Sequence, residues 1–405
     1  MGKSMHDVHR KRILGRACYL AAAVVLWACG PCTAEPLSAK QIAQAITPDD
    51  LDARMAVYRR QLEEYTRARA AFTESATAYW TAIAEKRRVR NSKRRDQELA
   101  LEDYVLTQPP VYSGPRKPVD PSAPIEEPAP TKAVPTVADF LQAAAEHFQF
   151  VPQQPTSELA YKRAYAQVAA AAGLTSEQVV RIYAFEAGGN GRYDVQAGLE
   201  YSRPNARAIS TALGYNQLLT ANSIELMAEK GDRFVKALRM NAAQLTGAAK
   251  ETLENKIAIV RTMIAFTRTV ADSWSEHERL ANTPKGLGIH AVLLDIDVGP
   301  LLQTQKLLDS VAFAKRRGIV RPLTAAELEM MNLTGDANGL DMILMPAAMR
   351  EQVPTSNFFQ RSGYERNPVA IRNNVVAKLL AAIDAKMDRE VKLQGAQDLA
   401  EAYPK

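Results

Sequence analysis

The chain has 405 residues, of which 24% are charged and 47% are hydrophobic, and its formal net charge is +6. The first 34 residues hold five Lys or Arg and one Asp, so residues 35–405 carry only +2. The basic character is therefore partly a property of the leader and gives no reason to expect a nucleic-acid partner. All three cysteines precede Glu35, so the remaining chain has no disulfide framework, thiolate metal site or cysteine nucleophile. A chain of this length can form a core without such cross-links.

Residues 1–34 are typical of an export signal. Four Lys or Arg lie between residues 10 and 16, and an apolar stretch of about twelve residues follows from Ala17 to Ala28. This stretch is too short to span a bilayer. Small residues precede Glu35, which favours cleavage after Ala34 and a periplasmic protein.

A second interpretation of the leader is a lipid anchor. Residues 26–29 resemble a lipobox in which Cys29 would carry the lipid, although Trp27 is bulky for that motif. No later segment is apolar enough to predict a membrane span.

Residues 35–105 are predicted to form a long helical, coiled-coil-like segment. A helix start lies at 47–50, where Pro and acids occupy the first turn. Apolar residues then recur at alternating spacings of four and three: Leu51, Met55, Tyr58, Leu62, Tyr65, Phe72, Ala76, Tyr79 and Ile83. This seam predicts pairing with another helix, either of an envelope protein partner or of a second copy of the chain.

Seven Lys or Arg follow between residues 86 and 95. We interpret this basic run as a solvated helix face, the alternative being contact with an anionic envelope polymer. Residues 106–136 contain nine prolines and are predicted to be a semi-rigid linker that marks a domain boundary or lies as a strap over the domain surface.

Residues 137–405 are predicted to form one mostly α-helical domain. Capping boxes at 175–178 and 324–327 mark two helix starts. The other predicted helices cover 157–172, about 222–231 with Gly231 at the end, about 248–274, 301–317 and about 369–391. We expect short strands near 192–199 and find no alternating pattern long enough for a major sheet.

Two segments of this domain resemble the lysozyme-like domain of lytic transglycosylases. The run 179–186 reads as a helix that ends in Glu186 and is followed by Ala187, Gly188 and Gly189. About thirty residues later comes a Gly-x-x-Gln-Leu turn at 214–218. The resemblance implies cleavage of the β-1,4 MurNAc–GlcNAc bond of peptidoglycan by one Glu acid/base, with 1,6-anhydro products and no cofactor.

Glu186 is the predicted catalytic residue. Cleavage of a glycosidic bond needs a proton for the leaving oxygen, and a solvated Glu is ionised at neutral pH. The negative end of its helix and the apolar residues Ile182, Tyr183 and Phe185 should raise its pKa. The glycines after it allow a sharp exit of the chain, which would leave the side chain reachable in a cleft.

The resemblance also implies a set of substrate-binding residues. Gln217 would orient the acid or bind an acetamido group, Tyr215 would stack on a pyranose face, and Asn216 would line the same cleft. Tyr364 is the candidate for the family's later tyrosine. The alternatives for the turn are that Gln217 caps backbone groups and that Tyr215 belongs to the core.

An inactive lysozyme-like module that binds the wall or serves as a scaffold is the alternative function. The family usually has Ser after the acid, where this chain has Ala187, and its Tyr-Asn-Ala-Gly motif is absent. A hydrolase would use a second carboxylate, for which Asp194 and Glu200 are the nearest acids after Glu186. The histidines lack ligand spacing, so no metal site is predicted.

Overall fold

The computed structural model describes residues 48–93, 99–123, 133–199 and 206–404. These residues are mostly helical, as predicted. The predicted export signal, the lipobox at Cys29 and Glu200 lie outside the described residues. No single described helix has the length and apolar character of a membrane span, and one bent pair, Pro284–Leu294 with Gly299–Arg316, passes that test by length and composition only.

The first described helix, α2 (Pro48–Lys93), lies within the segment 35–105 that was predicted to be helical. By its internal contacts the chain divides into two units, residues 1–62 with 118–123 and residues 63–117 with 124–405. The second half of α2 and the first part of the predicted linker thus belong to the same compact unit as the helical domain. This division differs from the boundaries that the sequence suggested at 105 and 136.

In the second half of α2 the apolar seam is buried within the larger unit. Ala76, Tyr79 and Ile83 are each less than a tenth exposed. The Tyr79 hydroxyl forms a 2.7 Å hydrogen bond with Ser356 Oγ, and Phe72 packs edge-on against Tyr112 with ring centroids 5.4 Å apart. The seam of this half therefore packs on irregular segments of its own chain, a partner that the heptad spacing does not predict.

The interpretation of the basic run as a solvated face is wrong for two of its members. Arg90 is 1% exposed, and its guanidinium donates to the carbonyl oxygens of Asp103 and Asn357, each at 2.9 Å. Arg87 donates to the carbonyls of Asn357 and Phe359 at 3.0 and 2.7 Å. These side chains tie α2 to two loops because a guanidinium can satisfy several carbonyls at once.

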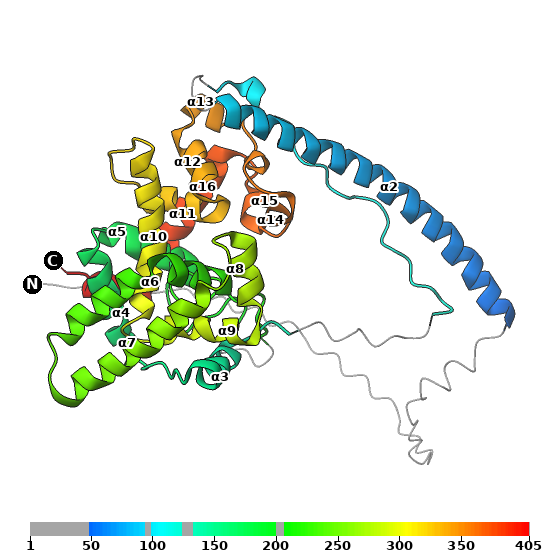
Figure 1. The fold of residues 1–405 in the computed structure, drawn as a ribbon. Coiled ribbons are helices and arrows are strands. Elements are labelled where there is room, and N and C mark those ends of the chain that lie inside the picture. Colours follow the sequence, from blue (N-terminus) through cyan, green and yellow to red (C-terminus); the bar gives the residue numbers. More distant parts are fainter. Residues whose placement is uncertain (1–47, 94–98, 124–132, 200–205, 405) are drawn as a thin grey trace, which may run out of the picture. The chain divides into compact units, whose positions relative to one another are not determined.

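The remaining described helices belong to the larger unit (Figure 1). Long connections precede α3 and α6, and the other connections are shorter. In chain order they are η1 (Leu101–Asp103), α3 (Val137–Phe148), α4 (Glu158–Ala171), α5 (Ser176–Ala187), α6 (Thr220–Ala242), α7 (Gly247–Thr267), α8 (Trp274–Ala281), α9 (Pro284–His290), η2 (Ala291–Leu294), α10 (Gly299–Arg316), α11 (Ala325–Thr334), α12 (Asp336–Leu344), α13 (Ala347–Arg350), η3 (Thr355–Asn357), α14 (Arg361–Glu365), α15 (Pro368–Arg372), α16 (Val376–Glu390) and α17 (Gln394–Ala402). Instead of the strands expected near 192–199, the described residues show only isolated bridges, which join Gln196 and Leu218 to Leu213.

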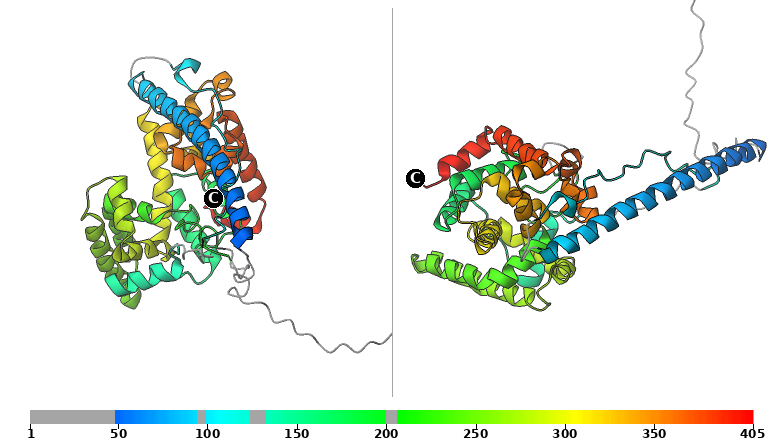
Figure 2. Two further views of the ribbon diagram at one scale, coloured as in Figure 1. Left: turned by 90° about the vertical axis from the view of Figure 1, so that its right-hand side faces the viewer. Right: turned by 90° about the horizontal axis from the view of Figure 1, so that it is seen from above.

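Helices α6 and α7 form an antiparallel pair, and the views of Figure 2 place this pair and the C-terminal helices α16 and α17 on opposite sides of the unit. Gly231 was predicted to end a helix, but it lies inside α6. A Cβ atom at this position would come within 2.6 Å of Ile264 Cγ1 on α7. The glycine therefore allows the two helices to approach closely, which overrides its low helix propensity.

The predicted helix over 369–391 is instead the two helices α15 and α16. The break falls at Asn373 and Asn374. The Asn374 side chain is buried and accepts hydrogen bonds from Thr355 Oγ1 at 2.7 Å and from the Ser356 backbone at 2.9 Å. These contacts satisfy buried polar groups of η3. A continuous helix through Asn374 would remove the asparagine side chain from these partners.

Candidate functional site

Local sequence positions Glu186 at the end of α5, as predicted. Thr175 caps the helix start: its hydroxyl accepts from the Gln178 backbone at 3.2 Å, and the Gln178 side chain accepts from the Thr175 backbone at 3.0 Å. Gly188 ends the helix in the left-handed conformation with φ = 65°, which glycine adopts without a steric penalty. Glu186 thus lies in the last turn, where the helix dipole disfavours an anion.

Three helices meet around the Glu186 side chain. α5, α11 and α16 pack against one another, so that residues far apart in sequence become neighbours. Oε1 of Glu186 accepts a 2.7 Å hydrogen bond from the side-chain amide of Asn332 on α11. Glu329 lies three residues before Asn332 on the same face of α11, and its carboxyl group lies beside that of Glu186.

The ammonium group of Lys386 on α16 contributes the positive charge nearest to this pair. Its Nζ donates to the carbonyl oxygen of Phe185 at 2.7 Å and lies 4.1 Å from the centroid of the Phe185 ring. The lysine thus binds the backbone next to Glu186 and the aromatic face. Within the described residues it makes no ion pair with either glutamate shorter than 4.0 Å.

The environment of the two carboxyl groups favours their neutral forms. Burial raises the pKa of Glu186 to about 7, although hydrogen bonds from Glu329 and Asn332 and the charge of Lys386 act in the opposite direction. Burial and the neighbouring Glu186 raise the pKa of Glu329 well above its usual range. Because the two groups interact, the pair loses its two protons in separate steps, each of which depends on the protonation state of the other group. A Glu with a pKa near 7 can both donate and accept a proton at neutral pH.

Sequence reasoning proposed Glu186 as the acid and did not point to Glu329, Asn332 or Lys386, which the structure places around it. A signal existed for Glu329, because it stands within the apolar run Leu328, Met330 and Met331. An acid in such a run is rarely buried without a specific partner. Nothing in the sequence shows that this partner is Glu186, since the packing of α11 on α5 decides it.

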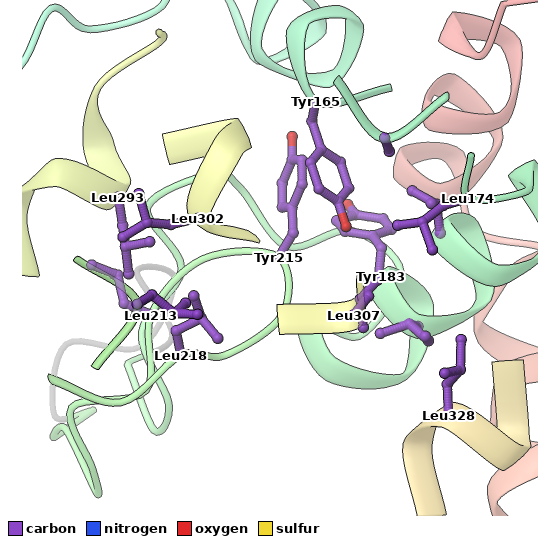
Figure 3. Close-up of a cluster of buried hydrophobic side chains, with 14 of the residues drawn as sticks. Tyr165, Leu174, Tyr183, Leu213, Tyr215, Leu218, Leu293, Leu302, Leu307 and Leu328 are labelled. Atoms are coloured by element: carbon purple, nitrogen blue, oxygen red, sulfur yellow. The ribbon is translucent and has the colours of Figure 1, made fainter. Parts of the chain in front are cut away.

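Tyr215 and Asn216, expected to line a cleft, instead belong to the core. Figure 3 shows Tyr215 among Tyr165, Tyr183 and buried leucines. Tyr215 is fully buried, and its hydroxyl donates a short hydrogen bond to Glu158. Asn216 is 3% exposed, and its amide donates to the Tyr165 hydroxyl at 2.9 Å and to the Gln303 carbonyl at 2.8 Å. In this structure neither side chain faces a cleft.

Gln217 holds its own turn together. Its backbone has φ = 44°, and its side-chain amide donates to the carbonyl oxygens of Val195 and Gly214 at 3.1 and 2.8 Å. These bonds give it the capping role that was the alternative for this turn, and no described hydrogen bond connects it with Glu186. Its side chain is partly exposed, so it stays a candidate for substrate contact.

The other predicted residues also lie in local clusters. Tyr364, on α14, is 5% exposed and packs against Trp80 and Phe359, with ring centroids 5.7 and 5.9 Å away. Asp194 forms an ion pair with Arg192 at 3.3 Å. Among the described residues, the second carboxyl group at Glu186 is therefore Glu329 rather than Asp194. No group of three His, Cys, Asp or Glu in the described part of the chain could hold a metal ion.

Two adjoining cavities of about 450 and 440 Å³ lie elsewhere in the unit, between the α4–α5 connection, α6 and α10. They share Ala172, Arg233, Gln305 and Leu308, and Glu186 lines neither of them. Comparisons of the chain with models of protein families, with curated proteins and with solved structures found no match.

Proposed function

We propose that this protein is an exported lytic transglycosylase that cleaves the β-1,4 MurNAc–GlcNAc bond of peptidoglycan with Glu186 as its acid/base. The observation that carries the proposal is the setting of Glu186: a half-buried carboxyl group at a helix end, bonded to Asn332 and placed beside a second, buried carboxyl group. Such a setting keeps a large fraction of a carboxylic acid protonated at neutral pH, and proton donation to a leaving group requires that form.

The proposed reaction uses this one residue twice. Protonated Glu186 donates its proton to the glycosidic oxygen while the bond from that oxygen to the anomeric carbon breaks, and the 2-acetamido group of the substrate assists. The Glu186 carboxylate then accepts the proton of the 6-hydroxyl, whose oxygen attacks the anomeric carbon and closes the 1,6-anhydro ring. No water is consumed, and Glu186 ends in the protonation state in which it began. Its pKa near neutrality suits both steps.

A second candidate is an inactive lysozyme-like module that binds the cell wall or serves as a scaffold. One observation favours it. Tyr215 and Asn216 are core residues, and the Gln217 amide bonds to its own turn, so the segment that would bind the sugar is occupied with structural contacts.

A digest of purified peptidoglycan tests the proposal. Residues 35–405 are incubated with it, and the soluble muropeptides are analysed by mass spectrometry beside a Glu186→Gln variant, whose amide cannot donate the proton. Products one water lighter than those of hydrolysis, lost in the variant, are expected. If neither protein releases products but both still sediment with the cell wall, the lytic activity is refuted. The inactive wall-binding or scaffold module would then be the supported function.

A further inference from the structure

Among the described residues, the buried Glu329 carboxyl group makes no ion pair within 4.0 Å, and Lys386 is the cation whose charge reaches it. It is fully buried, and neither of its oxygens accepts a hydrogen bond of normal geometry from a described donor. Asn332 faces it, but the hydrogen bond of its amide goes to Glu186 Oε1, and the Nζ of Lys386 is bonded to the Phe185 carbonyl. An ionised Glu329 would therefore be a buried charge without an ion pair or a hydrogen-bond donor of normal geometry among the described residues, which is far more costly than a buried neutral acid.

A neutral Glu329 carries a proton that needs an acceptor. A protonated carboxyl group has one O–H donor, and a buried donor without a partner destabilises the folded state. The groups that face it are Glu186 from α5, Asn332 from its own helix and Lys386 from α16. The lysine ammonium only donates, and Asn332 directs its NH₂ group, which also only donates, at the pair. The carboxyl group of Glu186 is therefore the acceptor that faces Glu329.

We propose that Glu329 is a positioning residue that stays protonated and donates a hydrogen bond to Glu186, holding the catalytic carboxyl group in place and in balance between its two protonation states. Burial alone would hold Glu186 too firmly in its acid form to serve as the base of the second step. A donor that bonds to the ionised form stabilises that form and moves the balance toward neutral pH. The role of Glu329 in the reaction rests on the proposed function, whereas the shared proton does not.

Two variants distinguish the effect of the Glu329 hydrogen-bond donor from the effect of its side-chain volume. Glu329→Gln keeps the size and an N–H donor, and Glu329→Leu keeps the volume but removes the donor. The control is Glu225→Gln. Glu225 is a partly buried glutamate on α6, and burial raises its pKa as well. The carboxyl carbons of ¹³C-glutamate-labelled protein are followed by NMR from pH 4 to 9, and Glu186→Gln and Glu329→Gln assign the two signals.

In the wild type we expect Glu186 to titrate near neutrality and Glu329 to remain protonated through pH 7. Glu329→Leu should move the Glu186 midpoint to higher pH, because the ionised form loses a donor, while Glu329→Gln and Glu225→Gln should leave it nearly unchanged. An unmoved midpoint in a folded Glu329→Leu protein would overturn the proposal. If that variant does not fold, the wild type alone decides: a Glu329 signal that reports an ionised carboxylate at pH 7 would overturn the proposal.

The pH dependence of muropeptide release separates this proposal from the proposed function. If the proposed function and the positioning role both hold, the basic limb of the pH profile of kcat/KM moves to higher pH in Glu329→Leu. In Glu329→Gln the limb should lie at its wild-type position. If the NMR shift occurs and no variant or wild type releases 1,6-anhydro products, the shared proton is established and the lytic activity is refuted. A basic limb that stays in place despite normal folding would refute the positioning role.

Discussion

The side-chain amide of Asn332 donates a 2.7 Å hydrogen bond to Oε1 of Glu186 and thereby joins α11 to the last turn of α5. Glu329 lies one helical turn before Asn332, so a single face of α11 carries both the amide that bonds to Glu186 and the carboxyl group beside it. Local sequence thus places Glu186, and a second helix holds its carboxyl group.

We expect Asn332→Ala to lower the rate of muropeptide release by about tenfold or more, because a misoriented acid loses at least about 1.4 kcal/mol of transition-state stabilisation. The loss should fall on kcat more than on KM, since Asn332 bonds to the acid. Asn282→Ala is the control, because the Asn282 amide is also bonded, to the Glu278 carbonyl at the surface of α8. A variant with wild-type kcat would show that Asn332 does not orient Glu186.

Tyr215→Phe should affect stability and leave the reaction unchanged. The change removes the hydroxyl that donates to Glu158, whose carboxylate keeps one bond, from the Tyr193 backbone at 3.2 Å. Loss of a buried donor to a charged group costs about 1–3 kcal/mol, which urea unfolding would detect. A raised KM with an unchanged free energy of unfolding would instead support the sequence-based expectation that Tyr215 contacts the sugar.

The helix boundaries that the sequence predicted correctly depend on local signals. Thr175 and Thr324 begin α5 and α11 with the expected capping boxes, and Gly188 ends α5 as a left-handed cap. Such signals depend on side chains within four residues of each other, so they can be recognised without knowledge of the tertiary structure.

The incorrect predictions concern groups whose partners are distant in sequence. Gly231 resembles a helix end, but it is the point at which α7 crosses α6. Arg90 resembles part of a solvated basic face, but its two carbonyl partners lie 13 and 267 residues away. For the same reason Glu329 and Asn332 could not be assigned to the site before the packing of α11 on α5 was known.

Arg90→Ala should destabilise the larger unit by about 3 kcal/mol or more. The change leaves the buried Asp103 carbonyl without its guanidinium donor and takes one of two donors from the Asn357 carbonyl, which keeps Arg87. It also removes the guanidinium that lies 4.5 Å from the centroid of the Tyr104 ring. Arg88→Ala, two residues earlier on the exposed face of α2, should change the free energy of unfolding by less than about 0.5 kcal/mol. Equal effects of the two changes would show that Arg90 contributes through its charge alone.

His290 should make the protein less stable in acid. The ring is fully buried; Nδ1 forms a 2.8 Å hydrogen bond with Ser223 Oγ, and Nε2 one of 2.9 Å with the Thr211 carbonyl. Since a carbonyl only accepts, Nε2 donates to Thr211, and in the neutral ring that burial favours Nδ1 accepts from Ser223. Burial lowers the pKa of His290 from 6.5 to about 4.

Between these two values the unfolded chain binds more protons at this residue than the folded chain does. Stability from neutral His290 is therefore complete above pH 6.5 and declines as the pH falls to about 4, by on the order of 3 kcal/mol. The Glu186–Glu329 pair acts in the opposite direction, because its raised pKa values favour the folded state at lower pH. Urea unfolding at steps of pH in the wild type and in His290→Gln isolates the histidine, since the glutamate contribution cancels in the difference. The difference should depend on pH below 6.5 and be flat above it, and a curve that is flat throughout would mean that His290 titrates alike in the folded and unfolded chains.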